Sequence, residues 1–369
     1  MEPTAEPFPD LPPPLLQRFG LWLHRILRAA SDAVVPPQLA LFERSFGAGT
    51  TQLLGLVARH RIADLLVEGP LPAAELARLT GLHPDLLHRV LRALASGGVF
   101  RLRDDGRFEH SRLSRALCSS QLQRTREWCE YFASGSNVAS WSALEETART
   151  GRSAFRWVQG TSVWEWFETH PEERETFAQA MMGITVSQAP LVAGLYPFQE
   201  LTTICDVGGG RGALLSELLI RHPHLQGVLV DGQGVLDSAQ ALLHRRGVSA
   251  RVRCVAGSFF EQLPPGADAY LLKNVLHDWD DARCRQLLGV CRAAMAPGQR
   301  LLVIETVTEP NETRGFGPLS DVQMGVVCEE GRERGEREYL SLLEQSGFRP
   351  GRVFGSPVVS VLEGVAVQP

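Results

Sequence analysis

From residue 202 onwards, short apolar runs alternate with amphipathic helical stretches, and this alternation constrains the fold more than any other feature of the sequence. The strand-like runs are Thr203–Val207, Gln226–Asp231, Arg251–Ala256, Ala269–Lys273 and Arg300–Thr306. The helical stretches lie at 211–221, 234–246 and 280–296. Such alternation predicts an α/β domain with a parallel sheet covered on both faces by helices. In sheets of this kind, ligands bind at the carboxyl ends of the strands.

The first 200 residues have helical spacing instead. Residues 1–14 are rich in proline and predict a disordered or extended tail. Residues 15–66 predict helices with a break at Pro36–Pro37. Residues 70–109 combine a helix, a turn, a second helix and a hairpin, which is a winged-helix pattern. Residues 120–200 predict an all-helical segment rich in aromatic side chains.

A winged helix can bind DNA through its second helix. Here that helix offers only His88, Arg89 and Arg92 as candidate contacts, with Asp85 at its start. Affinity for DNA needs several phosphate contacts, and the net charge of −5 also argues against a nucleic-acid partner. Packing or dimerisation is therefore the favoured interpretation. A ligand-sensing DNA-binding regulator is the alternative from another functional class.

Cysteine usage and the N-terminus bear on the compartment. The seven cysteines form no C-x-x-C pair and have no histidines at zinc spacing, which argues against a disulfide framework and a structural metal site. The start of the chain has no basic region of a secretory signal, and no run of about 18 apolar residues could span a membrane. We therefore predict a cytoplasmic protein with reduced thiols and no membrane partner.

The segment Asp206-Val-Gly-Gly-Gly-Arg-Gly-Ala follows the first strand and opens a helix. Gly208 and Gly210 let the backbone approach a ligand where no Cβ could fit. Asp231 ends the next strand, where a carboxylate can accept hydrogen bonds from ribose hydroxyls. The loop also fits the NAD fingerprint, so a nicotinamide enzyme is one alternative. However, the carboxylate of Asp206 opposes a pyrophosphate and suits the amino group of a methionine moiety, which favours S-adenosylmethionine.

A second motif, LLKNVLHDWDD, spans residues 271–281. Its His277 is predicted to lie above the cofactor crevice as a general base, since imidazole titrates near neutral pH. Glu305 closes the fifth strand, and a carboxylate there can hold the imidazole in one tautomer. Lys273, the only lysine beside 36 arginines, ends the fourth strand. A tight cofactor wall that rejects the larger guanidinium would explain it.

Taken together, GGGRG, VLVDG, GSFF, LLKNVLHDW and LVIET resemble, in this order and spacing, the plant-type small-molecule O-methyltransferases, including bacterial natural-product members. The resemblance covers nearly the whole chain. It implies a Rossmann-like class I methyltransferase domain at 201–369 that binds S-adenosylmethionine. It also implies an N-terminal helical and winged-helix dimerisation domain at 15–118, after a disordered tail at 1–14, and a helical substrate wall or linker at 119–200.

The resemblance also assigns roles to individual positions. His277 matches the family's base for the acceptor hydroxyl, and Glu305 and Glu333 match its two flanking glutamates. The cofactor positions, together with Asp206 and Gly210 of the loop, fall on Gly208, Asp231, Ser258, Phe259 and Lys273. The acceptor pocket is predicted to include Phe177, Met181, Asp278, Met324 and Cys328.

Two positions depart from the plant pattern. Ser258 stands where the plant pattern G-D-M-F has aspartate, so we expect a shorter hydroxyl there and Phe259 stacked on or beside the adenine. Cys328 stands where plant members often place asparagine near the acceptor, which argues against a plant-like phenylpropanoid substrate.

The sequence therefore predicts a homodimeric, metal-independent O-methyltransferase that uses S-adenosylmethionine. Its predicted acceptor is a phenolic or enolic hydroxyl of a small aromatic natural product. Methyl transfer to nitrogen or carbon is the nearest alternative. A relative that has turned to hydroxylation or decarboxylation is a further one.

Overall fold

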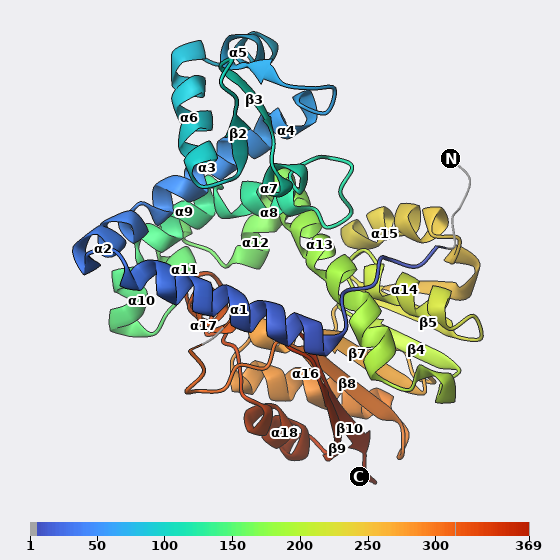
Figure 1. Ribbon diagram of the computed structural model, residues 1–369. Helices are drawn as coiled ribbons and strands as arrows, with labels where there is room; N and C mark the ends of the chain where they lie inside the picture. The colour runs from blue at the N-terminus through green and yellow to red at the C-terminus, as the bar shows by residue number, and fades with distance from the viewer. Residues whose placement is uncertain (1–5, 314, 369) are drawn as a thin grey trace. The chain divides into compact units, whose positions relative to one another are not determined.

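The computed structural model of the chain describes residues 6–313 and 315–368, which form two compact units (Figure 1). Among the described residues, unit 1 contains 6–21, 140–166, 185–313 and 315–368, and unit 2 contains Trp22–Ala139 and Phe167–Ile184. Among the described residues, no helix combines the length and apolarity that crossing a membrane requires.

Unit 1 is built around a seven-stranded sheet of order β6-β5-β4-β7-β8-β10-β9. Its strands are β4 (Thr203–Val207), β5 (Gln226–Asp231), β6 (Val252–Ala256), β7 (Ala269–Lys273), β8 (Arg300–Glu305), β9 (Phe348–Gly355) and β10 (Ser360–Ala366). The first five are the predicted strands, and they pair in parallel. The last two were not predicted, and β10 runs antiparallel to both β8 and β9. The sheet is therefore mixed: the five predicted strands form the expected parallel part, and two antiparallel strands extend it at this edge.

The strand order places the chemistry-bearing residues together. β4 pairs with β5 on one side and with β7 on the other, so the order of the strands reverses at β4. Ligands of open α/β sheets bind outside the carboxyl ends of the strands at such a reversal. The residues at these ends are Asp206 on β4, Asp231 on β5, Lys273 on β7 and Glu305 on β8.

Helices α14 (Ala213–Arg221), α15 (Gln233–Arg245) and α16 (Asp281–Ala294) confirm the predicted helical stretches to within two residues. Helix α18 (Glu336–Gln345) packs against α16 and the strands β9 and β10. Leucines and aromatic residues of α16 and α18 join the strands in one buried cluster that includes Leu287, Leu288, Tyr339, Leu342 and Leu343. Burial of each such side chain stabilises the folded state by about 1.5–3 kcal/mol. This cluster therefore holds α16 and α18, and the loops next to them, against the sheet.

Residues 6–13 precede the first helix and have extended, non-helical backbone. Phe8 within them is only 4% exposed, and its ring lies 3.8 Å from the guanidinium carbon of Arg246. The backbone N–H of Phe8 donates to the buried carboxylate of Glu217 at 2.8 Å. This stretch is therefore bound to unit 1, in contrast to a disordered tail. Residues 1–5 lie outside the described part of the chain.

Unit 2 contains the winged-helix module. It comprises α3 (Gly47–Arg59), α4 (Ile62–Leu65), α5 (Ala73–Thr80), α6 (Pro84–Ser96) and a sheet of β1 (Leu71–Pro72), β3 (Arg107–His110) and β2 (Phe100–Leu102). These elements confirm the predicted helix, turn, helix and hairpin. The sequence predicts one helix over roughly residues 49–66, but the structure divides this stretch into α3 and α4, because Arg61 adopts the left-handed φ of 50°.

A short helix, α7 (Arg112–Arg115), follows β3. Helices also fill the segment predicted to be all-helical: α8 (Thr125–Phe132), α9 (Gly135–Ser142), α10 (Leu144–Thr150), α11 (Ala154–Gln159), α12 (Val163–Thr169) and α13 (Pro171–Leu195). The first two helices of the chain are α1 (Pro14–Ala33) and α2 (Pro37–Ser45), separated as expected before Pro37. Helix α1 buries none of its residues, and its large apolar side chains stay exposed: Leu15, Leu16, Phe19, Leu21, Trp22, Leu23, Ile26 and Leu27. An uncovered apolar surface of this extent is typical of an interaction site.

Candidate active site

A glycine-rich loop follows β4 and leads into α14. Gly208 has a φ of 66°, and a Cβ placed on it would lie 3.3 Å from Val275 and 3.4 Å from the ring of Phe259. Gly210 is also left-handed, with a φ of 58°. Glycine adopts this backbone without a steric penalty. The loop thus forms a concave backbone surface, called the glycine cradle below, and a side chain on these glycines would occupy the space that it leaves open.

Asp206 lies beneath this loop and is 1% exposed. Neither of its carboxylate oxygens has a hydrogen-bond partner among the described residues. Burial raises the pKa of Asp206 to about 7, against the opposing effect of the Lys273 ammonium. An unpaired buried carboxylate is costly, so its presence indicates a ligand that supplies donors or positive charge. The amino group of a methionine moiety has that chemistry.

Asp231, at the end of β5, ties the two neighbouring loops together. Its carboxylate accepts hydrogen bonds from the backbone N–H of Gly210 at 2.9 Å and from that of Gly232 at 2.7 Å. Burial raises the pKa of Asp231. Each carboxylate oxygen retains a lone pair, which suits the acceptor role toward ribose hydroxyls that was predicted from the sequence.

Ser258 and Phe259 follow β6. The hydroxyl oxygen of Ser258 accepts a hydrogen bond from the backbone N–H of Phe260 at 3.2 Å, in the manner of a short side-chain turn. The ring of Phe259 borders Gly208 and lies 5.0 Å from that of Phe260. An aromatic ring therefore flanks the glycine cradle at the position predicted for the adenine.

Lys273 ends β7 between two acidic groups. Burial lowers its pKa to about 8, while the carboxylates of Glu305 and Asp206 oppose that shift. The lone lysine of the chain thus lies at the same strand ends as the glycine loop. After Lys273 the chain turns through Asn274, whose φ of 52° is left-handed, and this turn carries the next residues away from the sheet.

His277 lies on the 3-10 helix Leu276–Asp278 that follows this turn. Its Nδ1 atom is 3.5 Å from Oε2 of Glu305 and 3.3 Å from Oε1 of Glu333, and its Nε2 atom is 3.6 Å from Oδ1 of Asp278. The His277 side chain is 14% exposed, whereas those of Glu305 and Glu333 are 0% and 1% exposed. The structure thus brings together the three residues that the sequence predicted as a catalytic set.

Each glutamate is itself held in place. Oε1 of Glu305 accepts hydrogen bonds from the backbone N–H groups of Val275 at 3.0 Å and Leu276 at 2.9 Å. Oε1 of Glu333 accepts a hydrogen bond from the Ser320 hydroxyl at 2.7 Å. Their other oxygens are buried without a partner among the described residues. The free oxygen of Glu305 is the one that lies 3.5 Å from Nδ1 of His277, so it can accept a hydrogen bond from a proton held on that nitrogen.

Charge dominates the protonation of this cluster. Burial opposes the imidazolium, but the carboxylates of Glu305, Asp278 and Glu333 outweigh it and raise the pKa of His277 to about 10. Burial raises the pKa of Glu305 to about 7 and that of Asp278 to about 6, against the attraction of the imidazolium. Such shifts of several groups in one place are typical of functional sites.

The predicted acceptor residues fall in two places. Cys328 follows α17 (Gly317–Val327) and is buried, with its Sγ atom 3.6 Å from Oδ1 of Asp278. Met324 lies one turn earlier on α17, and its carbonyl accepts a hydrogen bond from the backbone N–H of Cys328 at 2.8 Å. Asp278, Met324 and Cys328 therefore belong to the same unit as His277.

Phe177 and Met181 lie instead on the part of α13 that belongs to unit 2. There the Phe177 ring packs against Phe167 at 4.9 Å and Tyr131 at 5.2 Å between centroids. Their role in an acceptor pocket stays a prediction.

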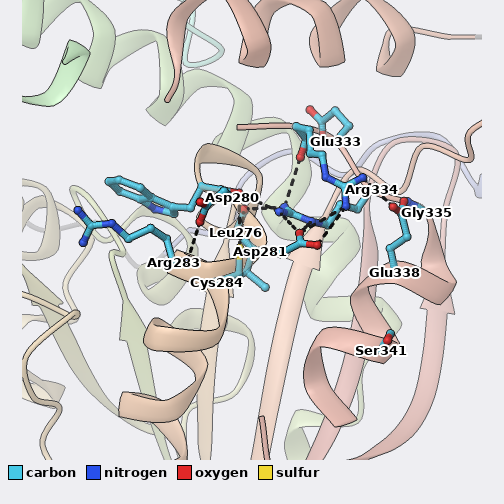
Figure 2. A network of polar contacts seen from close by, with 12 residues as sticks. Leu276, Asp280, Asp281, Arg283, Cys284, Glu333, Arg334, Gly335, Glu338 and Ser341 are labelled. Carbon is cyan, nitrogen blue, oxygen red and sulfur yellow. Dashed lines mark hydrogen bonds and ion pairs between the residues drawn. The ribbon is translucent and has the colours of Figure 1, made fainter. Parts of the chain in front are cut away.

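Sequence reasoning did not identify two features next to the site. Arg334, directly after Glu333, is fully buried and contacts the backbone around His277 (Figure 2). Trp279 stacks on Trp164 at 6.0 Å and meets Phe260 edge-on at 4.9 Å. The aromatic residue in the HDW motif was visible in the sequence, but its partners come from distant segments.

One ligand atom from each of His277, Glu305 and Glu333 lies within 4.8 Å of the other two, a spacing that a metal ion could also use. Metal-independent chemistry therefore stays a prediction.

Comparisons with known proteins agree with this geometry. Residues 141–349 match the model of the O-methyltransferase domain, and residues 43–120 match that of the O-methyltransferase dimerisation domain. The mitomycin biosynthesis 6-O-methyltransferase of Streptomyces lavendulae is 36% identical over 83% of this chain and 87% of its own length. The 8-amino-8-demethylriboflavin N,N-dimethyltransferase of Streptomyces davaonensis is 35% identical over 80% of this chain and 86% of its own length.

A solved structure of the neocarzinostatin-biosynthesis O-methyltransferase NcsB1, in complex with S-adenosylmethionine and 2-hydroxy-5-methyl naphthoic acid, superposes with a TM-score of 0.75. It is 32% identical to this chain and covers 86% of it and 96% of its own length. Sequence, fold and the geometry of the glycine loop lead to one conclusion. The chain belongs to the family of S-adenosylmethionine-dependent O-methyltransferases.

Proposed function

We propose that this enzyme methylates a phenolic or enolic hydroxyl of an aromatic natural product and that His277 is its general base. The observation that carries the proposal is the position of His277. Its Nδ1 atom faces two buried glutamates, at the sheet edge that also bears the glycine loop. A base is needed there because a phenol is a weak nucleophile until its proton is removed.

The residues around the glycine loop would hold the cofactor. Asp206 would receive its amino group, Asp231 its ribose hydroxyls, and Phe259 and Ser258 would border the adenine, with Gly208 and Gly210 allowing close approach. Lys273 would lie at the wall between Asp206 and Glu305. When bound, S-adenosylmethionine supplies an electrophilic methyl group on a cationic sulfonium.

The proton of the acceptor moves to Nε2 of His277. Glu305 and Glu333 favour a proton on Nδ1, which leaves the Nε2 lone pair free, and they stabilise the imidazolium that forms. The high pKa of His277, about 10, makes it a strong acceptor once it is neutral. Additional positive charge in the site would lower that pKa toward the working range. Alignment of the two reactants should supply much of the rate.

Relatives support an aromatic acceptor. NcsB1 was crystallised with a hydroxynaphthoic acid, and the relative from S. lavendulae is named for mitomycin. In this chain Asp278, Met324 and Cys328 are the proposed acceptor contacts next to His277, and Phe177 and Met181 are proposed for the pocket wall. The Cys328 thiol offers a smaller and less polar contact than the asparagine of plant enzymes.

An aromatic amine is the second candidate acceptor. The relative from S. davaonensis is named as an N,N-dimethyltransferase at nearly the same identity as the O-methyltransferase from S. lavendulae. A neutral His277 could equally remove a proton from an amine nitrogen after methyl transfer. Family membership therefore leaves the acceptor atom to experiment.

We also propose a homodimer formed through the N-terminal helices. Residues 43–120 match the family's dimerisation domain, and the exposed apolar side chains of α1 would be covered by a second copy. A cytoplasmic location is part of the same proposal, since all seven cysteines are free thiols.

A methylation assay tests the proposal. The enzyme is incubated with isotopically labelled S-adenosylmethionine and a panel of hydroxylated naphthoates, phenazines and aminophenols, and the methylated atom is located by NMR. We expect transfer to a ring hydroxyl, reduced about 10²–10⁴-fold in kcat by His277→Ala. The control His244→Ala removes an exposed imidazole on α15 and should leave kcat unchanged. Wild-type turnover by His277→Ala would disprove the base assignment, and exclusive N-methylation would favour the second candidate.

A further inference from the structure

Arg334 is the largest fully buried side chain among the described residues. It lies in the short loop between α17 and α18, directly after Glu333. The proposed reaction uses no arginine. The contacts of the buried Arg334 guanidinium must therefore explain why a charge is kept there.

All three guanidinium nitrogens have partners, and most of these lie in the segment that carries His277. Nη1 donates to the carbonyl of Leu276 at 2.9 Å, and Nη2 donates to the carbonyl of Trp279 at 2.8 Å. These carbonyls lie on either side of His277 in sequence. Nε and Nη2 also donate to Oδ1 of Asp281, at 3.1 Å and 2.7 Å. Figure 2 shows the Arg334 side chain extending toward Asp281 and the Leu276 segment.

The backbone of the Arg334 loop is fastened to the same segment. The N–H of Arg332 donates to the carbonyl of His277 at 2.8 Å. A Cβ on Gly331 would lie 2.8 Å from that carbonyl oxygen, so the two backbones are as close as glycine permits. The loop 331–334 is thus docked onto residues 276–281. Glu333 lies in the middle of the docked loop, and its distance to His277 depends on this docking.

The geometry requires arginine. Burying a charge costs free energy unless hydrogen bonds and an opposite charge compensate for it, and here Asp281 and two carbonyls do so. The planar guanidinium reaches two carbonyls and a carboxylate at once, which the compact ammonium of lysine does not match. A hydrophobic side chain could fill the same space at a lower desolvation cost, but it could not hold the Leu276 and Trp279 carbonyls in place.

We propose that Arg334 is a positioning residue that sets the distance between His277 and Glu333 by clamping the loop 331–334 to the residues on both sides of the base. The proposal rests on the proposed function, since it assumes that His277 takes a proton. It assigns no contact between Arg334 and the substrate or the cofactor.

Kinetics of Arg334→Met in the full-length enzyme test the proposal. A misplacement of about 1 Å can cost on the order of 100-fold in rate, so we expect kcat to fall about 100-fold. The affinity for S-adenosylmethionine, measured by calorimetry, should change less than about threefold. The limb of the kcat–pH profile should also move to lower pH, because His277 loses the influence of the Glu333 carboxylate. Arg334→Lys should resemble Arg334→Met.

Arg332→Met is the matched control. Arg332 belongs to the same loop, and its guanidinium also contacts Asp281, at 3.4 Å. Its guanidinium has no hydrogen bond to the Leu276 or Trp279 carbonyl among the described contacts. We expect its kcat and pH profile to match the wild type. Millimolar guanidinium should restore part of the kcat of Arg334→Ala and none of that of Arg332→Ala. A purely structural role would lower the thermal midpoint without moving the pH profile.

Two results would overturn the proposal: a kcat within threefold of wild type in Arg334→Met, or a lowered kcat with an unchanged pH profile. If Arg334→Met does not fold, Asp281→Asn decides, since it loosens the same clamp at its exposed end and should shift the profile in the same direction. His277→Ala is measured in parallel. An inactive His277→Ala beside a fully active Arg334→Met refutes only the clamp, whereas an active His277→Ala refutes the base.

Discussion

Nδ1 of His277 lies 3.3 Å from Oε1 of Glu333, although the two residues belong to different loops at the carboxyl edge of the sheet. Glu333 is buried and His277 nearly so, which strengthens their electrostatic interaction relative to a surface pair. Glu305 faces the same nitrogen from the end of β8 at 3.5 Å. The Nδ1 atom of the imidazole therefore faces two carboxylates, and Nε2 is the nitrogen that the proposed base would use for the substrate proton.

Replacing Glu333 by glutamine should shift the pH dependence of kcat. Only the neutral imidazole accepts a proton, so wild-type kcat rises with pH up to the pKa that His277 has when cofactor and acceptor are bound, and the neighbouring carboxylates raise that pKa. Glu333→Gln removes one of the carboxylates that raise this pKa, so the rising limb moves to lower pH while the plateau falls by about tenfold. Glu312→Gln, at an exposed position, is the control. An unmoved limb would mean that Glu333 does not act on the base.

Asp206→Asn should stabilise the cofactor-free enzyme and weaken cofactor binding. The native pKa of Asp206, about 7, exceeds its usual value of 3.8 because of burial, so the native state loses stability as pH rises between these values. Asparagine removes this loss, which amounts to a few kcal/mol at most. We expect a higher thermal midpoint at pH 8, a smaller gain near pH 4, and affinity for S-adenosylmethionine reduced at least tenfold.

The measurement is thermal unfolding with and without cofactor, from pH 4 to pH 8. Asp237→Asn, on the exposed face of α15, serves as a comparison and should change neither property. A less stable cofactor-free Asp206→Asn at pH 8 would show that the carboxylate already has a protein partner.

Substitution of Lys273 tests whether the cofactor wall requires lysine in a chain that otherwise uses arginine. Its ammonium lies between the carboxylates of Asp206 and Glu305, and burial lowers its pKa to about 8. A larger guanidinium at this place should crowd the cofactor wall, so Lys273→Arg should weaken S-adenosylmethionine binding at least fivefold in calorimetry, and Lys273→Met more strongly. If Lys273→Arg binds S-adenosylmethionine as tightly as the wild type does, cofactor binding does not explain why lysine stands at this position.

The apolar face of α1 should control the oligomeric state. Leu23 and Ile26 are 38% and 44% exposed, and a charge at either position would be buried at a dimer interface without compensation. The double variant Leu23→Asp, Ile26→Asp should sediment as a monomer at micromolar concentration, where the wild type sediments as a dimer. His24→Asp adds a charge to the same helix as a control. A dimer that survives the double variant would place the interface elsewhere.

The strand ends could be predicted from the sequence because each is local: an apolar run followed by glycine or a polar residue. For that reason Asp206, Asp231, Lys273 and Glu305 were located correctly at one edge. The last two strands could not be recognised in the same way. β9 contains Pro350 and Gly351, and β10 carries Glu363 at a buried position.

Those breaks in the pattern are compensated by partners that lie far away in sequence. The Glu363 carboxylate accepts a hydrogen bond from the Tyr196 hydroxyl at 2.7 Å, which only the folded chain reveals. Arg334 escaped prediction for the same reason. A charged residue in a loop is normally exposed, and its burial depends on two carbonyls that the segment 276–279 presents to it.

Phe8 should stabilise unit 1 from the N-terminal side. Its ring covers the Arg246 guanidinium, and Arg246 and Arg221 both pair with the fully buried Glu217 carboxylate. Phe8→Ala exposes this ion cluster to water and removes a buried ring, which should cost about 3 kcal/mol in urea unfolding, at the lower end for a buried phenylalanine. Leu86→Ala, at a position 57% exposed, should cost less than about 0.5 kcal/mol. If both variants unfold at the wild-type urea concentration, residues 6–13 contribute nothing to the stability of the unit.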